Sequence, residues 1–463
     1  MTRILIWNIN NFSRNKIFND STVQTLADSQ DREAHIVNQV MGPANPDIFV
    51  ILEAYSRTRE VGQTGTVISD SWPVGFGLLL LLDQIRTVHG NTWCLVPPLN
   101  VGEFGFREAV AVFYNAANLQ FIGPYLYAMQ PNYLVLGRPR GLVANVAALR
   151  NYPSDWWDCL PSPINPLPAL QLNRTSTVTI AGMAQNVPEW QFAGQWSYTY
   201  NAAPLYFPYN YNRSPFLTSF VDLTSASQRV INLFSIHTSP GTAVAAVQNL
   251  ALAPEIANCP GNNVNVVAGD FNVDTFDANN NAAYNGLDAN YEMLLDPRDA
   301  TNNINANRQP YCNTHVLPLN VATPFNNTGG VTDPQHNVYP RYGYMGSMGG
   351  YAFQTPVNSG SIDNIFRWYG GGLGAVNPSN ITIANTIVGT PYNQVMPAPG
   401  GVTAELTGGL PYATSLANAI PQPVGEPPPP AGTAAVALAN LQLWANYGRV
   451  RSTSDHLAVI ADV

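Results

Sequence analysis

Charged side chains are scarce in this sequence, and their scarcity limits what the protein can bind. Only 11% of the 463 residues are charged, where about a quarter is usual. Acidic residues outnumber basic ones by 29 to 20, so the net charge is −9, and Lys16 is the only lysine. This balance argues against holding nucleic acid by general electrostatic attraction, and a phosphate substrate would need a bound metal to offset the repulsion.

Cysteines and long apolar runs are also few. Cys94, Cys159, Cys259 and Cys312 lie far apart and form no CxxC pair, so neither a zinc site nor a dense disulfide scaffold is expected. The longest aliphatic run, residues 78–82, is too short to span a bilayer, so no transmembrane segment is expected. The first residues lack the pattern of a signal peptide. We therefore expect a protein that is cytoplasmic, or exported without a recognisable signal peptide.

Apolar residues and turn formers are plentiful. Hydrophobic residues make up 46% of the chain, and 38 prolines and 36 glycines divide it into short segments. The length suits two to four average domains, or one large α/β sandwich with insertions. Strands with similar polar ends occur on both sides of each stretch rich in Pro, Asn and aromatic residues. We therefore expect one catalytic domain, residues 1–463, with insertions at about 116–212, 320–358 and 369–430.

Periodicity predicts two helices among these strands. Residues 31–42 place Ile36, Val37, Val40 and Met41 on one side of an amphipathic helix. Residues 76–90 have the composition of a buried helix, and Gly90 is expected to close it.

Several buried strands end abruptly in polar residues. In "VVAGDFNVD", residues 266–274, a run of small apolar residues typical of a central strand gives way to Asp270 and Asn272. An acid and an amide at positions i and i+2 of extended backbone point the same way, and such an end favours a cation or a phosphate. Seven strand ends carry polar groups of this kind: Asn8, Glu53, Glu108, His237, Asp270 with Asn272, Asp363, and Asp455 with His456.

Taken in order, these residues resemble the motifs of the endonuclease/exonuclease/phosphatase superfamily, whose best-known member is deoxyribonuclease I. The motifs are "WNINNF", "VILEAY", "REAVAVFY", "SIHTSP", "GDFN", "SIDNIF" and "SDHLAV". The resemblance implies a four-layer α/β sandwich in which two packed mixed β-sheets are flanked by helices. It also implies a divalent-metal-dependent phosphoester hydrolase.

The resemblance gives each residue a role. Glu53 would be the central metal ligand, with Asn8 and Asp455 beside it, and hard oxygen ligands of this kind suit Mg²⁺ or Mn²⁺. Asp270 and Asn272 would orient the attacking water and a phosphate oxygen. A metal ion and fixed donors are what phosphodiester hydrolysis needs, because negative charge grows on the phosphate oxygens during attack.

Two histidines complete the predicted site. By resemblance, His456 pairs with Asp363 and His237 pairs with Glu108, since a carboxylate partner fixes the tautomer of a histidine. His456 would act as the general base or as a cationic clamp on the scissile phosphate. His237 would bind phosphate or assist the leaving group. Which histidine does which task stays open from the sequence.

The expected substrate is nucleic acid, DNA or RNA, cleaved at a phosphodiester bond, but alternatives remain. Nucleases of this family often carry a tyrosine at the position of Phe106, and phenylalanine lacks the hydroxyl that would reach the phosphate. A phosphatase or phosphodiesterase acting on a small or lipid-linked phosphate is therefore the second reading. A noncatalytic binding protein on the same fold is the third, with an Asn- and Tyr-rich surface that would hold sugar or protein partners. Taken singly, an Asp or Asn after a strand is often only a turn residue, and Glu108 could lie on the surface.

Overall fold

The computed structural model describes most of the predicted core strands and the helices around them. The described residues are 1–18, 32–55, 73–101, 108–123, 215–226, 229–253, 256–275, 282–296, 298, 314, 361–371, 381–385, 392–395 and 453–463, together with the backbone of ten short strands between 134 and 345.

The first sheet contains seven strands and both ends of the chain. Parallel pairing joins β1 to β2, and every other neighbouring pair is antiparallel. In spatial order the strands are β22 (Tyr392–Val395), β21 (Ile381–Asn385), β23 (Ala458–Asp462), β1 (Arg3–Phe12), β2 (Ile48–Tyr55), β4 (Glu108–Asn115) and β3 (Trp93–Val101).

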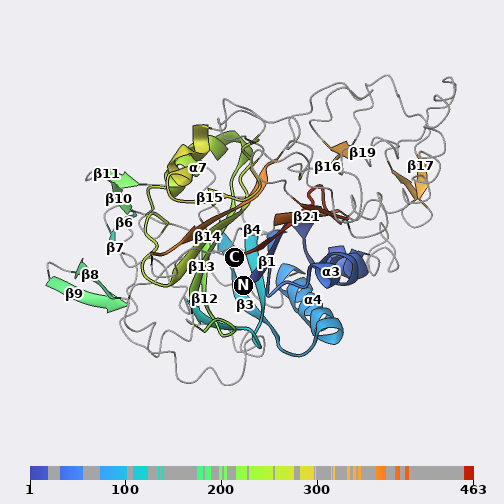
Figure 1. Cartoon of the computed structure of the whole chain (residues 1–463), viewed down its shortest axis with the longest axis horizontal. Coiled ribbons are helices and arrows are strands. Elements are labelled where there is room, and N and C mark those ends of the chain that lie inside the picture. The colour runs from blue at the N-terminus through green and yellow to red at the C-terminus, as the bar shows by residue number, and fades with distance from the viewer. Residues whose placement is uncertain are drawn as a thin grey trace.

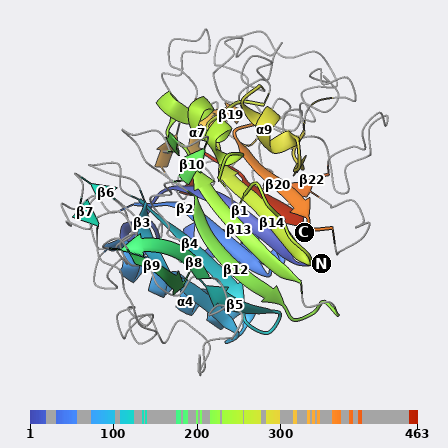
Figure 2. The same ribbon diagram turned by 90° about the vertical axis from the view of Figure 1, so that its left-hand side faces the viewer.

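The second sheet contains six strands and is mixed in the same way, with β13 and β14 parallel and the other pairs antiparallel. Figure 2 shows these strands face on, lying over the first sheet. In spatial order they are β15 (Glu292–Met293), β20 (Asp363–Tyr369), β14 (Asn263–Asp270), β13 (Val230–His237), β12 (Phe216–Asp222) and β5 (Leu119–Gly123).

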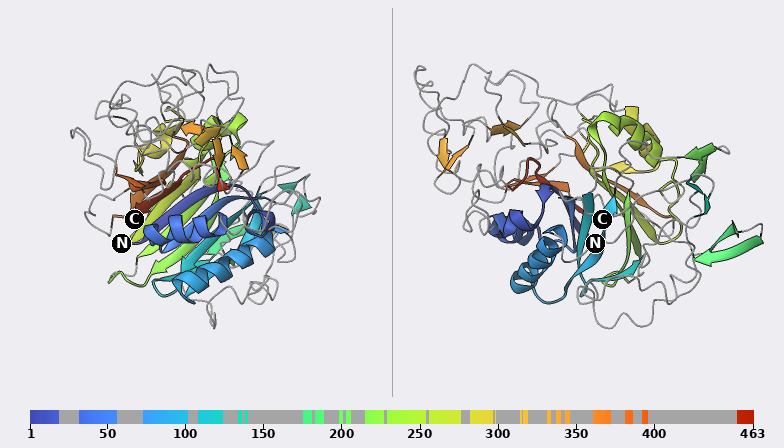
Figure 3. Two further views of the ribbon diagram at one scale, coloured as in Figure 1. Left: turned by 90° about the vertical axis from the view of Figure 1, so that its right-hand side faces the viewer. Right: turned by 180° about the vertical axis from the view of Figure 1, so that it is seen from behind.

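Helices cover the outer face of each sheet, so the molecule has four layers (Figures 1 and 3). The layer on the first sheet contains α1 (Arg14–Ile17), η1 (His35–Met41), α3 (Gly42–Ala44) and α4 (Pro73–His89). The layer on the second sheet contains η4 (Pro240–Thr242), α7 (Ala243–Leu250), η5 (Ala282–Tyr284) and α9 (Asn285–Asp288). The predicted sandwich of two mixed sheets flanked by helices is confirmed.

Both helices predicted from periodicity are present. The segment from residue 32 to 44 is helical, and the four apolar residues predicted to share one side are all buried. Helix α4 ends at His89, and Gly90 follows with a φ of 101°, a left-handed conformation that glycine adopts without a steric penalty.

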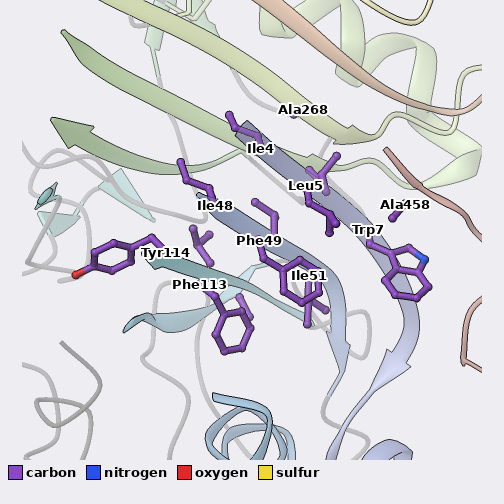
Figure 4. Packing of buried hydrophobic residues seen from close by; sticks show 14 of the residues in the cluster. Ile4, Leu5, Trp7, Ile48, Phe49, Ile51, Phe113, Tyr114, Ala268 and Ala458 are labelled. Carbon is purple, nitrogen blue, oxygen red and sulfur yellow. The ribbon is translucent and has the colours of Figure 1, made fainter. Parts of the chain in front are cut away.

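The largest core cluster fills the space between the sheets and continues under the first helical layer. Alternation along each strand sends successive side chains to opposite faces. Figure 4 shows Ile4 directed toward the second sheet and Phe113 directed toward the helices, and both are fully buried. A second cluster lies under α7, where Phe271, Tyr284 and Phe366 pack ring against ring. The two clusters hold the strand ends at fixed positions.

Two of the predicted insertions contain strands of the main sheets. Strand β5 lies within 116–212 and pairs with β12, and β21 lies within 369–430 and pairs with β23. Those stretches are therefore not insertions throughout. Both strands are five residues long and next to long polar or Pro-rich segments, which hides them from a reading based on composition.

Five separate two-stranded sheets are formed by segments that lie between the core strands in the sequence. They are β6 (Leu134–Val135) with β7 (Arg138–Pro139), β8 (Thr175–Ile180) with β9 (Met183–Pro188), β10 (Tyr198–Tyr200) with β11 (Ala203–Leu205), β16 (Val316–Pro318) with β19 (Gly343–Met345), and β17 (Val331–Asp333) with β18 (Asn337–Tyr339).

The two termini lie together (Figure 1), where Thr2 and Val463 exchange backbone hydrogen bonds. Cys94 and Cys259 are buried free thiols, while Cys159 and Cys312 lie outside the described residues. Within the described part of the chain, no helix has the length and apolar character needed to span a bilayer.

Candidate active site

The register of the second sheet brings three predicted site residues into one row. Asp270 at the end of β14 pairs with His237 at the end of β13 on one side and with Asp363 at the start of β20 on the other. Because β13 and β14 are parallel and β20 is antiparallel to β14, two strand ends and one strand start meet at the same edge. Buried apolar residues precede His237 and Asp270 in their strands and follow Asp363 in β20, and they hold this register.

A break in the first sheet positions the facing residues. The pairing of β1 with β2 shifts register between Asn8 and Phe12, and both Glu53 and Asn11 have positive φ, 56° and 53°. Left-handed backbone costs a non-glycine residue about 1–2 kcal/mol, so the surrounding contacts must hold it. Here the backbone N–H of Asn11 donates to Oε2 of Glu53 at 3.1 Å, which links the two distorted positions.

His237 is held by a buried carboxylate. Its Nδ1 lies 2.8 and 2.9 Å from the two carboxylate oxygens of Glu108. Glu108 is only 2% exposed, so it is no surface residue despite its place at the start of a strand. The contact fixes a proton on Nδ1 and leaves Nε2 of His237 to face the site.

His456 is held in the same way by Asp363, whose Oδ2 lies 2.8 Å from Nδ1 of the imidazole. Burial on its own lowers the pKa of His456, but the carboxylates of Asp363, Asp270 and Asp455 outweigh it and raise the pKa to about 10. His456 is therefore a cation at neutral pH in the metal-free protein.

Both histidines converge on one carboxylate. Oδ2 of Asp270 lies 3.5 Å from Nε2 of His237 and 3.8 Å from Nε2 of His456, and it accepts a hydrogen bond of 3.0 Å from Nδ2 of Asn8. Asp270 is 1% exposed. Burial and the nearby Asp363 raise its pKa, although the two histidines oppose this effect. Asp270 is the centre of the site.

Glu53 lies beside this centre and is partly open to solvent. Its Oε1 is 3.6 Å from Nε2 of His237 and accepts a 3.3 Å hydrogen bond from Asn8. Burial raises the pKa of Glu53, but the two histidines, Asn8 and the Asn11 backbone together lower it below its ordinary value. The carboxylate is therefore ionised at neutral pH, as a metal ligand must be.

The structure places Asp455 and Asn272 at the margin of the centre. Oδ1 of Asp455 accepts a 3.1 Å hydrogen bond from Asn10 and lies 3.9 Å from Nε2 of His456. Asn272, with a φ of 49°, donates its backbone N–H to Oδ1 of Asp270 and its side-chain N–H to the carbonyl of Thr238. The predicted site residues are thus brought together, while Phe106 lies outside the described residues.

The donor set fits a hard divalent cation. Five carboxylates gather around two histidines, which leaves an excess of negative charge that a cation would offset. Oδ1 of Asn8 is buried without a hydrogen-bond partner, an unusual state for an amide oxygen and one that a metal ion would relieve.

A second grouping of possible ligands lies beside it. Within the described residues, atoms of Asp270, Asp363 and His456 lie within 4.8 Å of one another and could hold a metal. Asp363 already accepts the hydrogen bond from Nδ1 of His456, and a metal bound by that carboxylate would compete with it. Glu53 and the unpartnered oxygen of Asn8 are free of that conflict.

Four supporting residues were not predicted. Trp7 donates its indole N–H to the carbonyl of His456 at 2.8 Å, and the Ser454 hydroxyl joins the backbones of Asn8 and His456. Asn10 and Asn11 orient the carboxylates of Asp455 and Glu53. The one signal in the sequence is proximity, because each lies one to three residues from a predicted site residue.

Comparisons with known proteins give structural neighbours only. No protein-family model and no curated protein matches the sequence. D. rerio TDP2 complexed with a single-strand DNA product is 8% identical, with a TM-score of 0.37 over 99% of this chain and 97% of that one. The mannosyl-6-phosphatase Bt3783 of Bacteroides thetaiotaomicron is 10% identical, with a TM-score of 0.34 over 100% and 99%.

A third neighbour is an endonuclease/exonuclease/phosphatase family protein from Leptotrichia buccalis, at 12% identity and a TM-score of 0.34 over 79% of this chain and 88% of that one. The fold and the site geometry described above come from this chain alone. In its two packed sheets and in the order of its site residues, the chain resembles the endonuclease/exonuclease/phosphatase superfamily.

Proposed function

We propose that this protein is a divalent-metal-dependent phosphoester hydrolase that cleaves phosphodiester bonds of nucleic acid by activated water. One observation carries the proposal. The Nε2 atoms of two histidines, each held through Nδ1 by its own buried carboxylate, face the single carboxylate of Asp270 at 3.5 and 3.8 Å. Such an arrangement suits a reaction in which a phosphate gains negative charge beside a water that loses a proton.

Glu53 and Asn8 would hold a Mg²⁺ or Mn²⁺ ion, with Asp455 close by. When bound, the ion would neutralise charge on the phosphate oxygens and polarise the phosphorus centre. The lowered pKa of Glu53 and the unpartnered Oδ1 of Asn8 support this assignment.

The remaining residues would handle the proton and the phosphate. A cationic His456 is a poor general base but can hold the negative charge of a phosphate. Its raised pKa therefore favours the role of phosphate clamp over that of general base. Asp270 would orient the attacking water and receive its proton, since its pKa is raised and Asn272 holds its other oxygen. The Nδ1 atom of His237 carries a proton and donates a hydrogen bond to Glu108. Through Nε2, His237 would bind phosphate or assist the leaving group.

A panel of substrates tests the proposal. Purified protein would be incubated with plasmid DNA, single-stranded RNA and bis-p-nitrophenyl phosphate in Mg²⁺ or Mn²⁺, with EDTA as the control. Nucleic-acid cleavage that EDTA abolishes is the expected result. Turnover of the small diester alone would favour a small-phosphate hydrolase, and no turnover with either metal would favour a noncatalytic binding protein on this fold.

A further inference from the structure

Two exposed aromatic side chains lie close to one arginine in the first helical layer. The guanidinium carbon of Arg14 is 5.2 Å from the ring centroid of Phe18 and 5.3 Å from that of Phe76. The two rings are 41% and 40% exposed, and they are the only aromatic side chains among the large exposed apolar residues in the described ranges. Arg14 itself is half-buried. An arginine held against two exposed rings forms a stacking surface.

Close packing of two helices creates this group. Arg14 and Phe18 belong to α1 and its end, and Phe76 lies in the first turn of α4. A Cβ on Gly77 would lie 2.5 Å from the backbone nitrogen of Arg14, so only glycine allows α1 and α4 to come this close. The amide of Phe18 also bonds to the carbonyl of Arg14 at 2.7 Å, which fixes the end of α1.

The topology places this group at the same end of the molecule as the site. Helix α1 begins three residues after Asn11, which bonds to Glu53. Strand β3 runs toward the site, because its last residue, Val101, pairs with Glu108, while its first residue, Trp93, pairs with Asn115. Helix α4 ends at His89, beside the start of β3 and thus at the end of the sheet far from the site. The first turn of α4, with Phe76, therefore lies toward the site end of the sheet.

A lysine in α1 is linked to the site through Asn10. Lys16, the only lysine of the chain, lies in α1 and donates from Nζ to the carbonyl of Asn10, whose side chain holds Asp455. The buried guanidinium of Arg32 bonds to the carbonyl of Lys16 and keeps this part of α1 in place. The region around α1 therefore carries positive charge, although the protein as a whole is acidic.

We propose that Phe18, Arg14 and Phe76 form a stacking platform for an unpaired base of single-stranded nucleic acid whose phosphate is bound at the site. Bases stack on exposed aromatic rings and on arginine without regard to sequence, while the bases of a duplex already stack on each other. This inference rests on the proposed function and adds a preference for single strands over duplex.

Binding and hydrolysis test it separately. Binding would be measured by fluorescence anisotropy with Mg²⁺ in an Asp270→Asn background, which removes the proposed proton acceptor and keeps His456, the proposed phosphate clamp. The ligands would be a labelled single-stranded oligonucleotide and an abasic strand of equal length and charge. The variant Phe18→Leu/Phe76→Leu keeps apolar packing but removes both rings. We expect its Kd for the base-containing strand to rise about tenfold and its Kd for the abasic strand to stay unchanged.

Leu223→Ala and Val244→Ala, which alter exposed apolar residues elsewhere, should leave both affinities unchanged. Equal weakening toward both strands, or no weakening, would overturn the platform. Failure of the parent to bind the strand would overturn it too. Hydrolysis of methyl p-nitrophenyl phosphate by the ring variant with Asp270 intact should match the wild type. If the wild type hydrolyses nothing, the proposed function fails. If the wild type hydrolyses its substrates but the ring variant binds the base-containing strand as tightly as its parent does, only the platform is refuted.

Discussion

Oδ2 of Asp363 lies 2.8 Å from Nδ1 of His456, although 93 residues separate the two in the sequence. The negative charge of Asp363 is the largest of the effects that raise the pKa of His456. Asp363→Asn should therefore lower that pKa from about 10 by about 1 to 3 pH units. An NMR titration of the metal-free protein would measure it. Hydrolysis should fall about 100-fold or more, and an unchanged titration would show that the contact does not control the proton.

Glu108→Gln tests the partner of His237. Glutamine can still accept a hydrogen bond from Nδ1, but it carries no charge and can also present an N–H, which would favour the wrong tautomer. We expect kcat to fall by about 100-fold or more while the protein stays folded. Steady-state kinetics and circular dichroism would measure this, with Glu292→Gln as a control because Glu292 pairs with Arg367 away from the site. Equal losses in both variants would contradict a specific role for Glu108.

Asn8→Ala tests the metal assignment without relying on catalysis. The variant removes the unpartnered Oδ1 and the donor to Glu53 and Asp270. We expect the affinity for Mn²⁺, measured by isothermal titration calorimetry, to fall roughly tenfold or more. Asn118→Ala is the matched control, because that amide bonds to Asp47 on another part of the sheet. Unchanged Mn²⁺ affinity would place the ion elsewhere, and Asp270, Asp363 and His456 would then be the next group to test.

Asp222 gives a prediction about stability and pH. It accepts hydrogen bonds from Thr2, Thr224 and Arg229 in a buried cluster that joins the chain ends to β12. Burial raises the pKa of Asp222, but these donors outweigh it and hold the pKa below its ordinary value. A depressed carboxylate pKa contributes stability above the unfolded-state pKa, and this contribution is lost as pH falls through the folded value.

Asp222→Asn should therefore lower the free energy of unfolding by about 3 kcal/mol at pH 7. The difference from wild type should shrink as pH falls below about 4. Urea unfolding followed at several pH values would measure both effects. A difference that is independent of pH would show that the charge of Asp222 is not what stabilises this cluster.

The sequence predicted the centre of the site because its residues follow strong strand patterns. Asp270 is an acid directly after a run of buried small residues, and its neighbours in the sheet, His237 and Asp363, end or begin strands of the same kind. The pairing of Asp363 with His456 came from the family resemblance, since no local pattern links residues so far apart.

The supporting contacts could not be predicted. The bonds from Asn10 and Asn11 depend on where β1 loses its register with β2 and on a positive φ at Asn11, which the sequence does not specify. The short strands β5, β21 and β22 fell within the predicted insertions because a short strand beside long polar segments gives little periodic signal. The buried position of Glu108 depends on the packing of one sheet against the other.

The most direct test of the account is the rate at which Glu53→Gln hydrolyses bis-p-nitrophenyl phosphate in saturating Mg²⁺ or Mn²⁺, measured beside wild type with and without EDTA. Glutamine keeps the size of the side chain and removes the charge that would hold the ion. The account predicts that wild type turns over the substrate only with metal and loses this activity in EDTA. It also predicts that the rate of the variant falls by about 100-fold or more, while its free energy of unfolding stays unchanged. Full activity of Glu53→Gln, or wild-type turnover that EDTA does not affect, would contradict it.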